Sequence, residues 1–332
     1  MSATLTSAFE AVEMSFLAIV RRFIDSRPLR TALVAAVVVP AFAHAATTPR
    51  WERGESLPLP RTEVAAARSG NEFVIVGGYV PWGDTSAQAD AYAPATRRWR
   101  PLPDLPVAVN HAMAATWRGK AVVIGGYVGR NAPSDRAFVL ENGRWRELAR
   151  LPAGRAAGGA AVIGDTLYVI AGIGPAGLTR ASYALDLRRN RWRQIPGPTP
   201  REHLAVTATG GRLYALAGRT AGLDTNLRVL ESWKPGAQRW TRLPPVPVAR
   251  GGTGATAVGR TIVSIGGEAP GGTIASVYAF DTTSRRWRRL PDLPTARHGL
   301  GVVANGRTVY AIAGGPQPGL TTSGAVEYLK LP

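Results

Sequence analysis

Short apolar runs alternate with polar segments rich in glycine and proline along the chain from residue 51 onward. The runs are 4 to 8 residues long and rich in Val, Ile, Tyr and Trp, which is typical of β-strands and too short for helices. One run recurs six times and always ends at a glycine, reading FVIVG, AVVIG, YVIAG, YALAG, IVSIG and YAIAG. The glycines that end these runs are Gly77, Gly125, Gly172, Gly218, Gly266 and Gly314. The pattern predicts six copies of one β-sheet unit.

Six tryptophans repeat with the same period of about 47 residues: Trp51, Trp99, Trp145, Trp192, Trp240 and Trp287. Four-stranded propeller blades have this period, whereas helical solenoids have shorter ones. In the fifth copy, GATAVG, GRTIVSIGG, ASVYAFD and RRWRRLPDLP supply four expected strands. The first strand of each copy is rich in Ala and Gly, as six strands converging on one axis require. The sequence therefore predicts an all-β, six-bladed β-propeller with four strands per blade.

Particular residues of each copy resemble kelch repeats. In the fifth copy these are Gly266-Gly267, Tyr278, Trp287 and Leu290-Pro291. The resemblance extends from about Trp51 to Leu331 and implies a kelch-type propeller. Ile173 and Arg219 stand where we expect the second glycine of the pair, so the turns of copies 3 and 4 are expected to differ in shape. The expected repeat units are 61–106, 107–152, 153–198, 199–246, 247–294, and 295–332 joined by 51–60.

The two ends of the repeat region complement each other. The last copy ends after a third strand, AVEYLKL, while Trp51 to Leu59 is a tryptophan strand with no copy before it. We expect the Trp51 strand to pair beside Tyr328 and to close the ring. Closure would leave no open sheet edge for aggregation.

Residues 1–45 have the features of an export signal. Four arginines precede the apolar run TALVAAVVVPAFA, which ends in Ala43-His44-Ala45, a small-x-small cleavage site. We expect a cleaved signal peptide, a mature domain over residues 46–332, and a periplasmic or secreted protein. Met14 is an alternative start, and an uncleaved membrane anchor is the alternative fate. Arg21-Arg22 resembles a twin-arginine signal only weakly, so the export route stays open.

The chain contains no cysteine, which excludes disulfides, thiolate zinc sites and cysteine catalysis. It also excludes a galactose oxidase, the kelch enzyme whose cofactor requires a cysteine linked to a tyrosine. We expect no cofactor.

The net charge is +18, and +17 without the first 45 residues. Many of the arginines flank the tryptophan strands, for example Arg188-Arg189 and Arg285-Arg286. They form either an ordinary solvated surface or a surface that adheres to polyanions. Specific nucleic-acid binding is not expected because no reader motif is present.

Candidate ligand-binding residues precede the innermost strands, where propeller loops converge on a channel mouth. Five copies place an arginine there, and the second copy places Asn110. A ring of guanidinium groups would bind carboxylates through bidentate hydrogen bonds. The alternative is that each arginine pairs with an acid or packs on a neighbouring turn. The five arginines are Arg61, Arg155, Arg201, Arg250 and Arg297, and Arg219 is a further candidate in a loop of the fourth copy.

Three histidines, His111, His203 and His298, lie in alternate copies, 14, 15 and 16 residues before the glycines that end the apolar runs. Hydrogen bonding to a ligand, a structural role and a three-histidine metal site are the alternatives. The drift in spacing argues against identical geometry, so no metal site is expected.

Glu268 directly follows a glycine pair in the loop GGEAPGGT. Such a carboxylate is a candidate general base, with the histidines, Tyr79 or Tyr127 as partners. The loop is similar to the Gly-Glu-Ala-x-Pro-Gly loop of the exported sialic-acid mutarotases, whose proposed base is its glutamate. That family continues with Leu-Arg-Thr, whereas this chain has Gly272-Thr273-Ile274.

Three classes of function follow from these observations. The first is a binding or interaction module for carbohydrate or protein at an arginine-lined mouth. The second is a mutarotase or epimerase that acts on an acidic sugar with Glu268 as base. The third is a basic surface protein that adheres to polyanions. The oligomeric state does not follow from the sequence.

Overall fold

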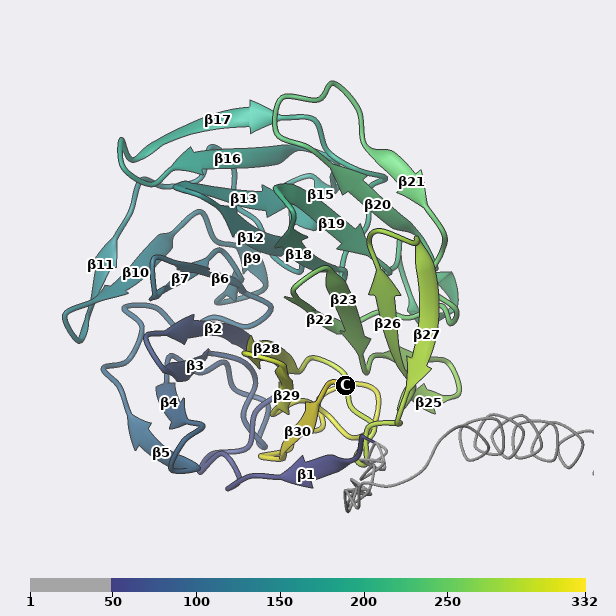
Figure 1. Cartoon of the computed structure of the whole chain (residues 1–332). Helices are drawn as coiled ribbons and strands as arrows, with labels where there is room; N and C mark the ends of the chain where they lie inside the picture. The colour runs from purple at the N-terminus through teal and green to yellow at the C-terminus, as the bar shows by residue number, and fades with distance from the viewer. Residues whose placement is uncertain (1–48) are drawn as a thin grey trace, which may run out of the picture. The chain divides into compact units, whose positions relative to one another are not determined.

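The computed structural model describes residues 49–332. These residues form six four-stranded antiparallel sheets, which follow one another as blades around a central axis (Figure 1). This is the predicted six-bladed propeller. The expected signal peptide over residues 1–45 lies outside the described residues.

The strands repeat in the same order in every blade. The innermost strands are β2 (Ala65–Ser69), β6 (Met113–Trp117), β12 (Gly159–Ile163), β18 (Ala205–Thr209), β22 (Gly254–Val258) and β28 (Gly301–Asn305). The second strands are β3 (Glu72–Val76), β7 (Lys120–Ile124), β13 (Thr166–Ile170), β19 (Arg212–Leu216), β23 (Thr261–Ile265) and β29 (Thr308–Ile312). The third strands are β4 (Ala89–Ala93), β10 (Ala137–Glu141), β16 (Ser182–Asp186), β20 (Leu230–Trp233), β26 (Val277–Asp281) and β30 (Val326–Lys330). The outer strands are β5 (Arg98–Pro101), β11 (Arg144–Glu147), β17 (Arg191–Ile195), β21 (Thr241–Leu243), β27 (Arg286–Leu290) and β1 (Trp51–Arg53).

Short elements also occur in the connections between second and third strands. Three of these connections form two-stranded ribbons: β8 (Tyr127–Val128) with β9 (Ala132–Pro133), β14 (Ile173–Gly174) with β15 (Gly177–Leu178), and β24 (Glu268–Ala269) with β25 (Gly272–Thr273). The fourth blade has a 3-10 turn, η1 (Leu223–Thr225), in this place. Among the described residues, no helix has the length and apolar character needed to cross a bilayer.

The hydrophobic core lies between neighbouring blades. Val122 and Ile124 of β7, for example, share one buried cluster with Leu167 and Val169 of β13. The second strands are buried on both faces, which explains their continuous apolar runs. The innermost strands line an axial channel of about 360 Å³ with small side chains, as their Ala and Gly content predicts.

The repeated tryptophans join adjacent blades. In every blade the indole N–H donates to a backbone carbonyl that follows the outer strand of the preceding blade; for Trp192 the acceptor is Ala149, at 2.8 Å. The other pairs are Trp51 with Pro291, Trp99 with Glu55, Trp145 with Pro103, Trp240 with Pro196 and Trp287 with Pro244. The predicted packing of these rings against the neighbouring blade is confirmed. These indole rings are partly buried, and tryptophan N–H groups in such places usually find an acceptor.

The N-terminal strand closes the ring as predicted, because β1 pairs with β30 at the outer edge of the last blade (Figure 1). The register differs by one residue from the expected one. Trp51 lies opposite Leu329, and Glu52 lies opposite Tyr328. The shift places the Trp51 ring in the buried cluster between the last two blades.

The position of the glycine pair corrects one sequence interpretation. Ile173 and Arg219 do not replace the second glycine; they follow it, and they form the bridge that Tyr79 forms in the first blade. Alanine replaces the first glycine instead, as at Ala171 and Ala217. The first position has φ of 53° to 68°, which alanine adopts at a cost, whereas the second has φ of 86° to 121°, where side chains are rarely found.

Candidate functional site

Six equivalent residues form a closed backbone ring at one mouth of the channel. They are Glu63, His111, Ala157, His203, Gly252 and Gly299, and all have φ between 50° and 62°. The N–H of His111 donates to the carbonyl of Glu63 at 3.0 Å, and the pattern continues from blade to blade. The N–H of Val64 closes the ring by donating to Gly299 at 3.2 Å. The ring fixes where its side chains point.

The ring brings two histidines into contact. His111 and His203 occupy the same position two blades apart, and the small Ala157 between them leaves room for both imidazoles. Their Nε2 atoms are 3.0 Å apart. His111 and His203 lie at the same distance from the second glycine of their pairs, so the difference in their spacing came from counting to the first glycine in one blade and to the second in the other. His298 alone lies one residue before the ring position.

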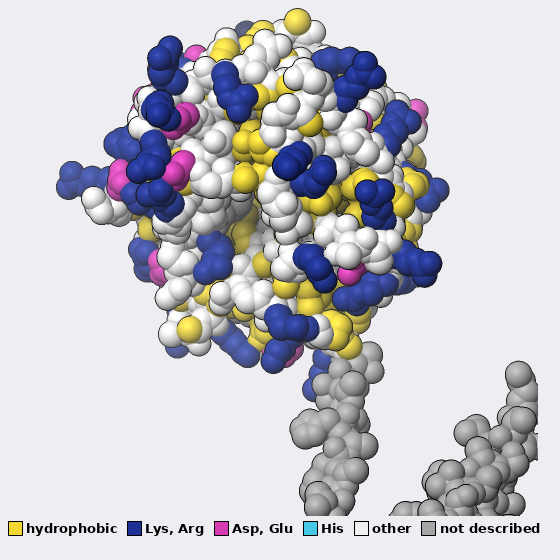
Figure 2. Space-filling model, turned by 45° about the horizontal axis from the view of Figure 1, so that its top comes forward, with side chains coloured by type: hydrophobic (Ala, Val, Ile, Leu, Met, Phe, Trp, Pro, Cys, Tyr) yellow, Lys and Arg dark blue, Asp and Glu magenta, His cyan; other side chains and the backbone are white. Residues whose placement is uncertain are grey.

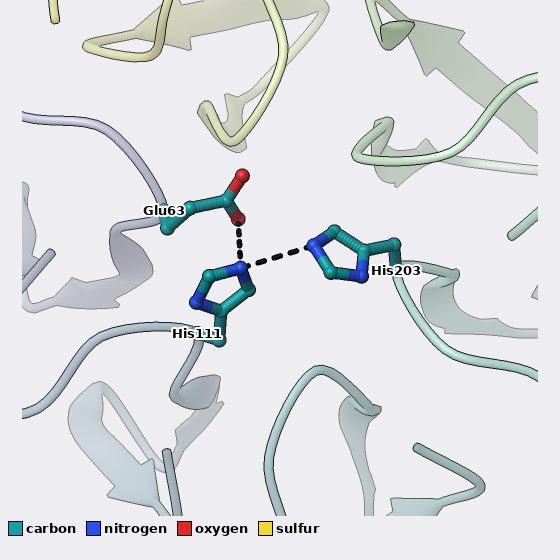
Figure 3. A group of neighbouring side chains, drawn as sticks. All are labelled: Glu63, His111 and His203. Carbon is teal, nitrogen blue, oxygen red and sulfur yellow. Dashed lines mark hydrogen bonds and ion pairs between the residues drawn. The ribbon is translucent and has the colours of Figure 1, made fainter. Parts of the chain in front are cut away.

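Glu63 completes this group, although the sequence analysis did not select it. One carboxylate oxygen lies 3.4 Å from Nε2 of His111, and the other lies 3.0 Å from Nδ1 of His298. Figure 3 shows the side chains of Glu63, His111 and His203 converging from three different blades. Glycine at position 299 makes the space, because a Cβ there would lie 2.6 Å from the Glu63 carboxylate. One feature of the sequence could have indicated Glu63 as a site residue: it is an acidic residue just before an alanine-rich innermost strand.

The polar contacts continue around the mouth. Glu268 lies 3.7 Å from Nδ1 of His298 and accepts a hydrogen bond of 2.7 Å from Arg219. Arg219 also donates to Glu202 at 3.0 Å, and the second oxygen of Glu202 lies 3.0 Å from Nδ1 of His203. We call these seven residues the mouth network: Glu63, His111, Glu202, His203, Arg219, Glu268 and His298. None of the seven side chains is more than 13% exposed.

The environment sets the protonation of the histidines that contact Glu63. Burial lowers the pKa of His111 to about 4, so its imidazole is neutral at pH 7. Burial alone would lower the pKa of His298, but its contact with the Glu63 carboxylate raises it. Burial alone would likewise raise the pKa of Glu63, but His111 and the hydrogen bond from His298 hold it well below its usual range. Glu63 is therefore an ionised carboxylate.

The five predicted receptor arginines do not line the mouth. Arg61, Arg155, Arg201, Arg250 and Arg297 are at most 1% exposed and lie inside their blades. Arg297, for example, donates to the carbonyl of Ala313 at 2.8 Å and pairs with Glu327 at 2.5 Å. Arg61 pairs in the same way with Asp90, and Arg201 with Glu231. The expectation of an arginine-lined mouth is thus corrected in favour of internal pairing, which satisfies carbonyls at the turn between second and third strands.

The remaining two arginines have aromatic neighbours instead of carboxylates. Arg155 lies over the ring of Tyr183 and Arg250 over the ring of Tyr278, each 5.4 Å from the ring centroid. Burial lowers the pKa of Arg250 to about 10. Both guanidinium groups also donate to backbone carbonyls of their own blades.

Asn110 does not occupy the arginine position of the second blade. Val109 stands there, because its carbonyl accepts the bond that the arginine carbonyls accept in other blades. The Asn110 amide oxygen lies 2.6 Å from Nδ1 of His111, and its amide nitrogen donates to Thr85 at 2.8 Å. Asn110 therefore orients the imidazole of His111.

A pocket of about 450 Å³ opens beside the mouth network, over blades 1 to 3. Its wall includes Tyr79, Tyr127 and Ile173, which follow the glycine pairs of those blades, together with one edge of His111. The ring centroids of His111 and Tyr127 are 5.5 Å apart. The pocket combines an apolar wall with two phenol groups.

The two ends of the propeller differ in character. The exposed large hydrophobic side chains found in residues 49–332 are Trp82, Leu178, Val248 and Leu320. All four lie in connections that leave the blades at the mouth end. The turns at the opposite end carry exposed arginines, among them Arg97, Arg118, Arg144, Arg189, Arg212, Arg260 and Arg307. Figure 2 shows how Lys and Arg outnumber acidic side chains on the face in view.

Comparison with curated proteins finds similarity to kelch-like proteins. The chain is 29% identical over 242 residues to Kelch-like protein terF of Aspergillus terreus (strain NIH 2624 / FGSC A1156), which covers 66% of this chain and 52% of that protein. It is 29% identical over 153 residues to Beta-scruin of Limulus polyphemus, covering 43% of this chain and 17% of that protein. The chain thus spans about half of the first relative and much less of the second.

Two family models also match the chain. The KLHDC2/KLHL20/DRC7 Kelch-repeats domain matches residues 110–315, more than half of the chain. The Kelch motif matches residues 60–106. Together the matches extend over all six blades. With its glycine pairs, its bridging tryptophans and its six four-stranded blades, this chain belongs to the kelch-repeat family of β-propellers.

Proposed function

We propose that this propeller is a protein-interaction module that binds a peptide segment of its partner across the mouth end. One observation carries the proposal: the exposed large hydrophobic side chains gather in the loops of that end. Exposed apolar groups around a pocket are typical of interaction surfaces. The pocket of Tyr79, Tyr127 and Ile173 lies among these loops and offers an apolar wall with hydrogen-bonding hydroxyls. A peptide with an apolar or aromatic side chain fits this chemistry.

The charges at the mouth favour a peptide over an acidic sugar. The mouth network has three carboxylates and one guanidinium group, and the five arginines expected to bind a carboxylate are buried. An acidic saccharide would therefore meet like charge. Binding at the loop face leaves the internal arginine pairs undisturbed.

Binding is also a better fit to the geometry than catalysis by Glu268. This side chain is 3% exposed and is bonded to Arg219. A general base must reach the proton that it removes. A substrate of the mutarotase type would have to open the Arg219 pair before it reached the carboxylate.

Selection from a displayed random-peptide library tests the proposal. We expect enriched peptides to contain apolar or aromatic residues and to bind the wild-type protein in a fluorescence titration. Trp82→Ala and Tyr127→Ala should each weaken that binding about tenfold or more, as for anchor residues of interfaces. Arg189→Ala, in a turn at the opposite end, is the matched control and should leave the affinity unchanged.

Three outcomes would contradict this assignment. The first is a library that yields no peptide binder. The second is an equal loss of affinity in the Arg189→Ala control. The third is competition by sialic or uronic acids for the same site, which would favour the carbohydrate module over the peptide module.

We further infer that the module acts outside the cytoplasm, in the periplasm or after secretion. The basic segment, apolar run and Ala43-His44-Ala45 motif support export. Mass spectrometry of the exported protein should find an N-terminus at Ala46. An intact Met1 or Met14 terminus in the membrane fraction would favour an anchored protein.

A further inference from the structure

Three potential metal ligands meet at the centre of the mouth. The carboxylate of Glu63 and one ring nitrogen each of His111 and His203 all lie within 4.8 Å of one another. Two of the three separations are 3.0 Å, between the two Nε2 atoms, and 3.4 Å, between a carboxylate oxygen of Glu63 and Nε2 of His111. Ligands of a tetrahedral Zn²⁺ ion at its usual bond lengths lie about 3.3 Å apart. Two of the three separations therefore match those of a coordination sphere.

The hydrogen bond behind the His111 imidazole decides which of its ring nitrogens carries a proton. Nδ1 of His111 faces the amide oxygen of Asn110 at 2.6 Å, and the Asn110 amide nitrogen donates to Thr85. Nδ1 of His203 lies 3.0 Å from a carboxylate oxygen of Glu202. The amide oxygen of Asn110 is an acceptor, so Nδ1 of His111 carries an N–H. Nε2 of His111 is then left with a lone pair.

This arrangement brings the Nε2 lone pair of His111, Nε2 of His203 and one carboxylate oxygen of Glu63 close together. Such acceptors repel one another unless a cation or a proton lies between them. Two histidines and one carboxylate form the ligand set of open transition-metal sites. The second oxygen of Glu63 is held by His298, so that carboxylate is oriented as well.

The centre of the mouth is also open on one side. A cavity of about 100 Å³ is lined by Glu63, His111 and His203 together with small residues such as Ala157 and Gly252 and the larger Leu204 and Leu300. Three protein ligands and space for a fourth define a site that keeps one position for water or a ligand.

We propose that Glu63, His111 and His203 bind one divalent transition-metal ion, of the class of Zn²⁺, across the mouth of the channel. The ion replaces the mutual repulsion of the ligand atoms with three bonds that link blades 1, 2 and 4. The site goes beyond the peptide surface proposed above: the two share only an edge of His111, and Glu63 and His203 are not among the residues that line that pocket. Mg²⁺ is not expected to bind, because it prefers oxygen ligands.

Calorimetric titration of the full, untagged and chelator-treated chain with ZnCl₂ tests the proposal. We expect one Zn²⁺ per chain and no binding of Mg²⁺. His111→Ala and His203→Ala should each weaken Zn²⁺ binding about 100-fold or more, since each removes a ligand whose supporting partners alone contribute 10- to 100-fold. His44→Ala is the matched control, because it removes a histidine from the expected export signal and should leave the affinity unchanged.

The wild-type protein also gives a test that needs no variant. The electron paramagnetic resonance spectrum of bound Cu²⁺ should show coupling to two imidazole nitrogens. Failure of the wild type to bind Zn²⁺ would overturn the proposal and leave a shared proton between the imidazoles. Zn²⁺ binding that survives both histidine changes, or a Cu²⁺ spectrum without two nitrogens, would overturn it equally.

Discussion

The interior of the blades and the mouth network both enclose charged groups, but only the first arrangement is repeated. Five blades contain a buried arginine that donates to backbone carbonyls of the same blade. The mouth network differs from blade to blade, because its members lie at the ring position, at the residue before it or at the residue after the glycine pair, and no one of these positions keeps the same side chain in all blades. A feature that every blade needs belongs to the framework. A feature that breaks the repeat, as Glu63 and the two histidines do, is the better candidate for a site.

The energetic consequences of the two arrangements should differ accordingly. A buried ion pair adds little net stability, yet loss of one partner leaves a charge in a poorly solvating interior. The mouth residues lie beside an axial cavity and an open pocket, where water can replace a lost partner. We therefore expect changes inside the blades to lower stability and changes at the mouth to alter binding.

Deletion of residues 51–60 should have the largest effect on the framework. It removes β1, exposes the edge of β30 and deletes the Trp51 hydrogen bond to Pro291. The loss of stability should exceed the roughly 3–5 kcal/mol expected for truncating one large buried aromatic residue. Thermal and denaturant unfolding with Trp192→Ala as the reference measure it. An unchanged midpoint would disprove the closing role of β1.

Arg297→Leu should follow, with a loss of about 3–5 kcal/mol in the free energy of unfolding, because Glu327 remains buried without its partner. The double change Arg297→Leu/Glu327→Leu is the control and should recover much of the loss. Denaturant titration of both variants measures the difference. A double variant as unstable as the single one would indicate that the carbonyl bonds, and not the charge pair, carry the effect.

Arg250→Leu should cost less, about 1–3 kcal/mol, since it leaves unpaired backbone carbonyls but no buried carboxylate. Its guanidinium group has Tyr278 and Ser276 as neighbours, and no ion pair with an acid in the described part of the chain. The difference in unfolding free energy between Arg297→Leu and Arg250→Leu measures the cost of leaving the Glu327 carboxylate buried without its partner. Equal losses in the two variants would remove that distinction.

Most of the fold could be predicted because six copies repeat the same signals. The tryptophan period, the apolar runs and the unpaired terminal strand predicted the blades and their closure. The spacing of the glycines could not show which member of the pair is kept in every blade. A single glycine marks the repeat, and it is the first residue of the pair in Gly77-Gly78 but the second in Ala171-Gly172. The φ angles separate them: one position tolerates alanine, and the other has a φ where side chains are rarely found.

The site was less predictable because side-chain direction depends on packing across blades. The arginine pattern predicts receptor groups. A second signal indicates internal pairs instead: Asp90, Glu231 and Glu327 follow Arg61, Arg201 and Arg297 by about 30 residues. Glu63 was passed over because a single acid carries no spacing signal. Its contact with His111 depends on the curvature of the ring, which brings residues from neighbouring blades together.

His203→Ala should change stability by about 1 kcal/mol or less, which separates the mouth from the blades. The backbone there has φ of 50°, and Ala157 already adopts the same φ at the equivalent position of the third blade. Alanine is therefore compatible with the ring of backbone bonds. Denaturant titration without added metal measures the effect. A loss of unfolding free energy near that of Arg297→Leu would show that His111 and His203 stabilise the fold and are not mainly a binding site.

Arg189→Ala should have the smallest effect, with no measurable shift in the unfolding midpoint. Its side chain is 79% exposed and pairs with Asp186 at the end opposite the mouth, where solvent and salt screen the charges. The same change should lower the salt concentration that elutes the protein from a heparin column, because the turns at this end carry much of its positive charge. Gln194→Ala, an uncharged change in the adjoining strand, is the control. If Arg189→Ala destabilises the protein, the surface arginines also contribute to the stability of the propeller. The contrast between charges inside the blades, which stabilise the fold, and charges in solvent, which do not, would then fail.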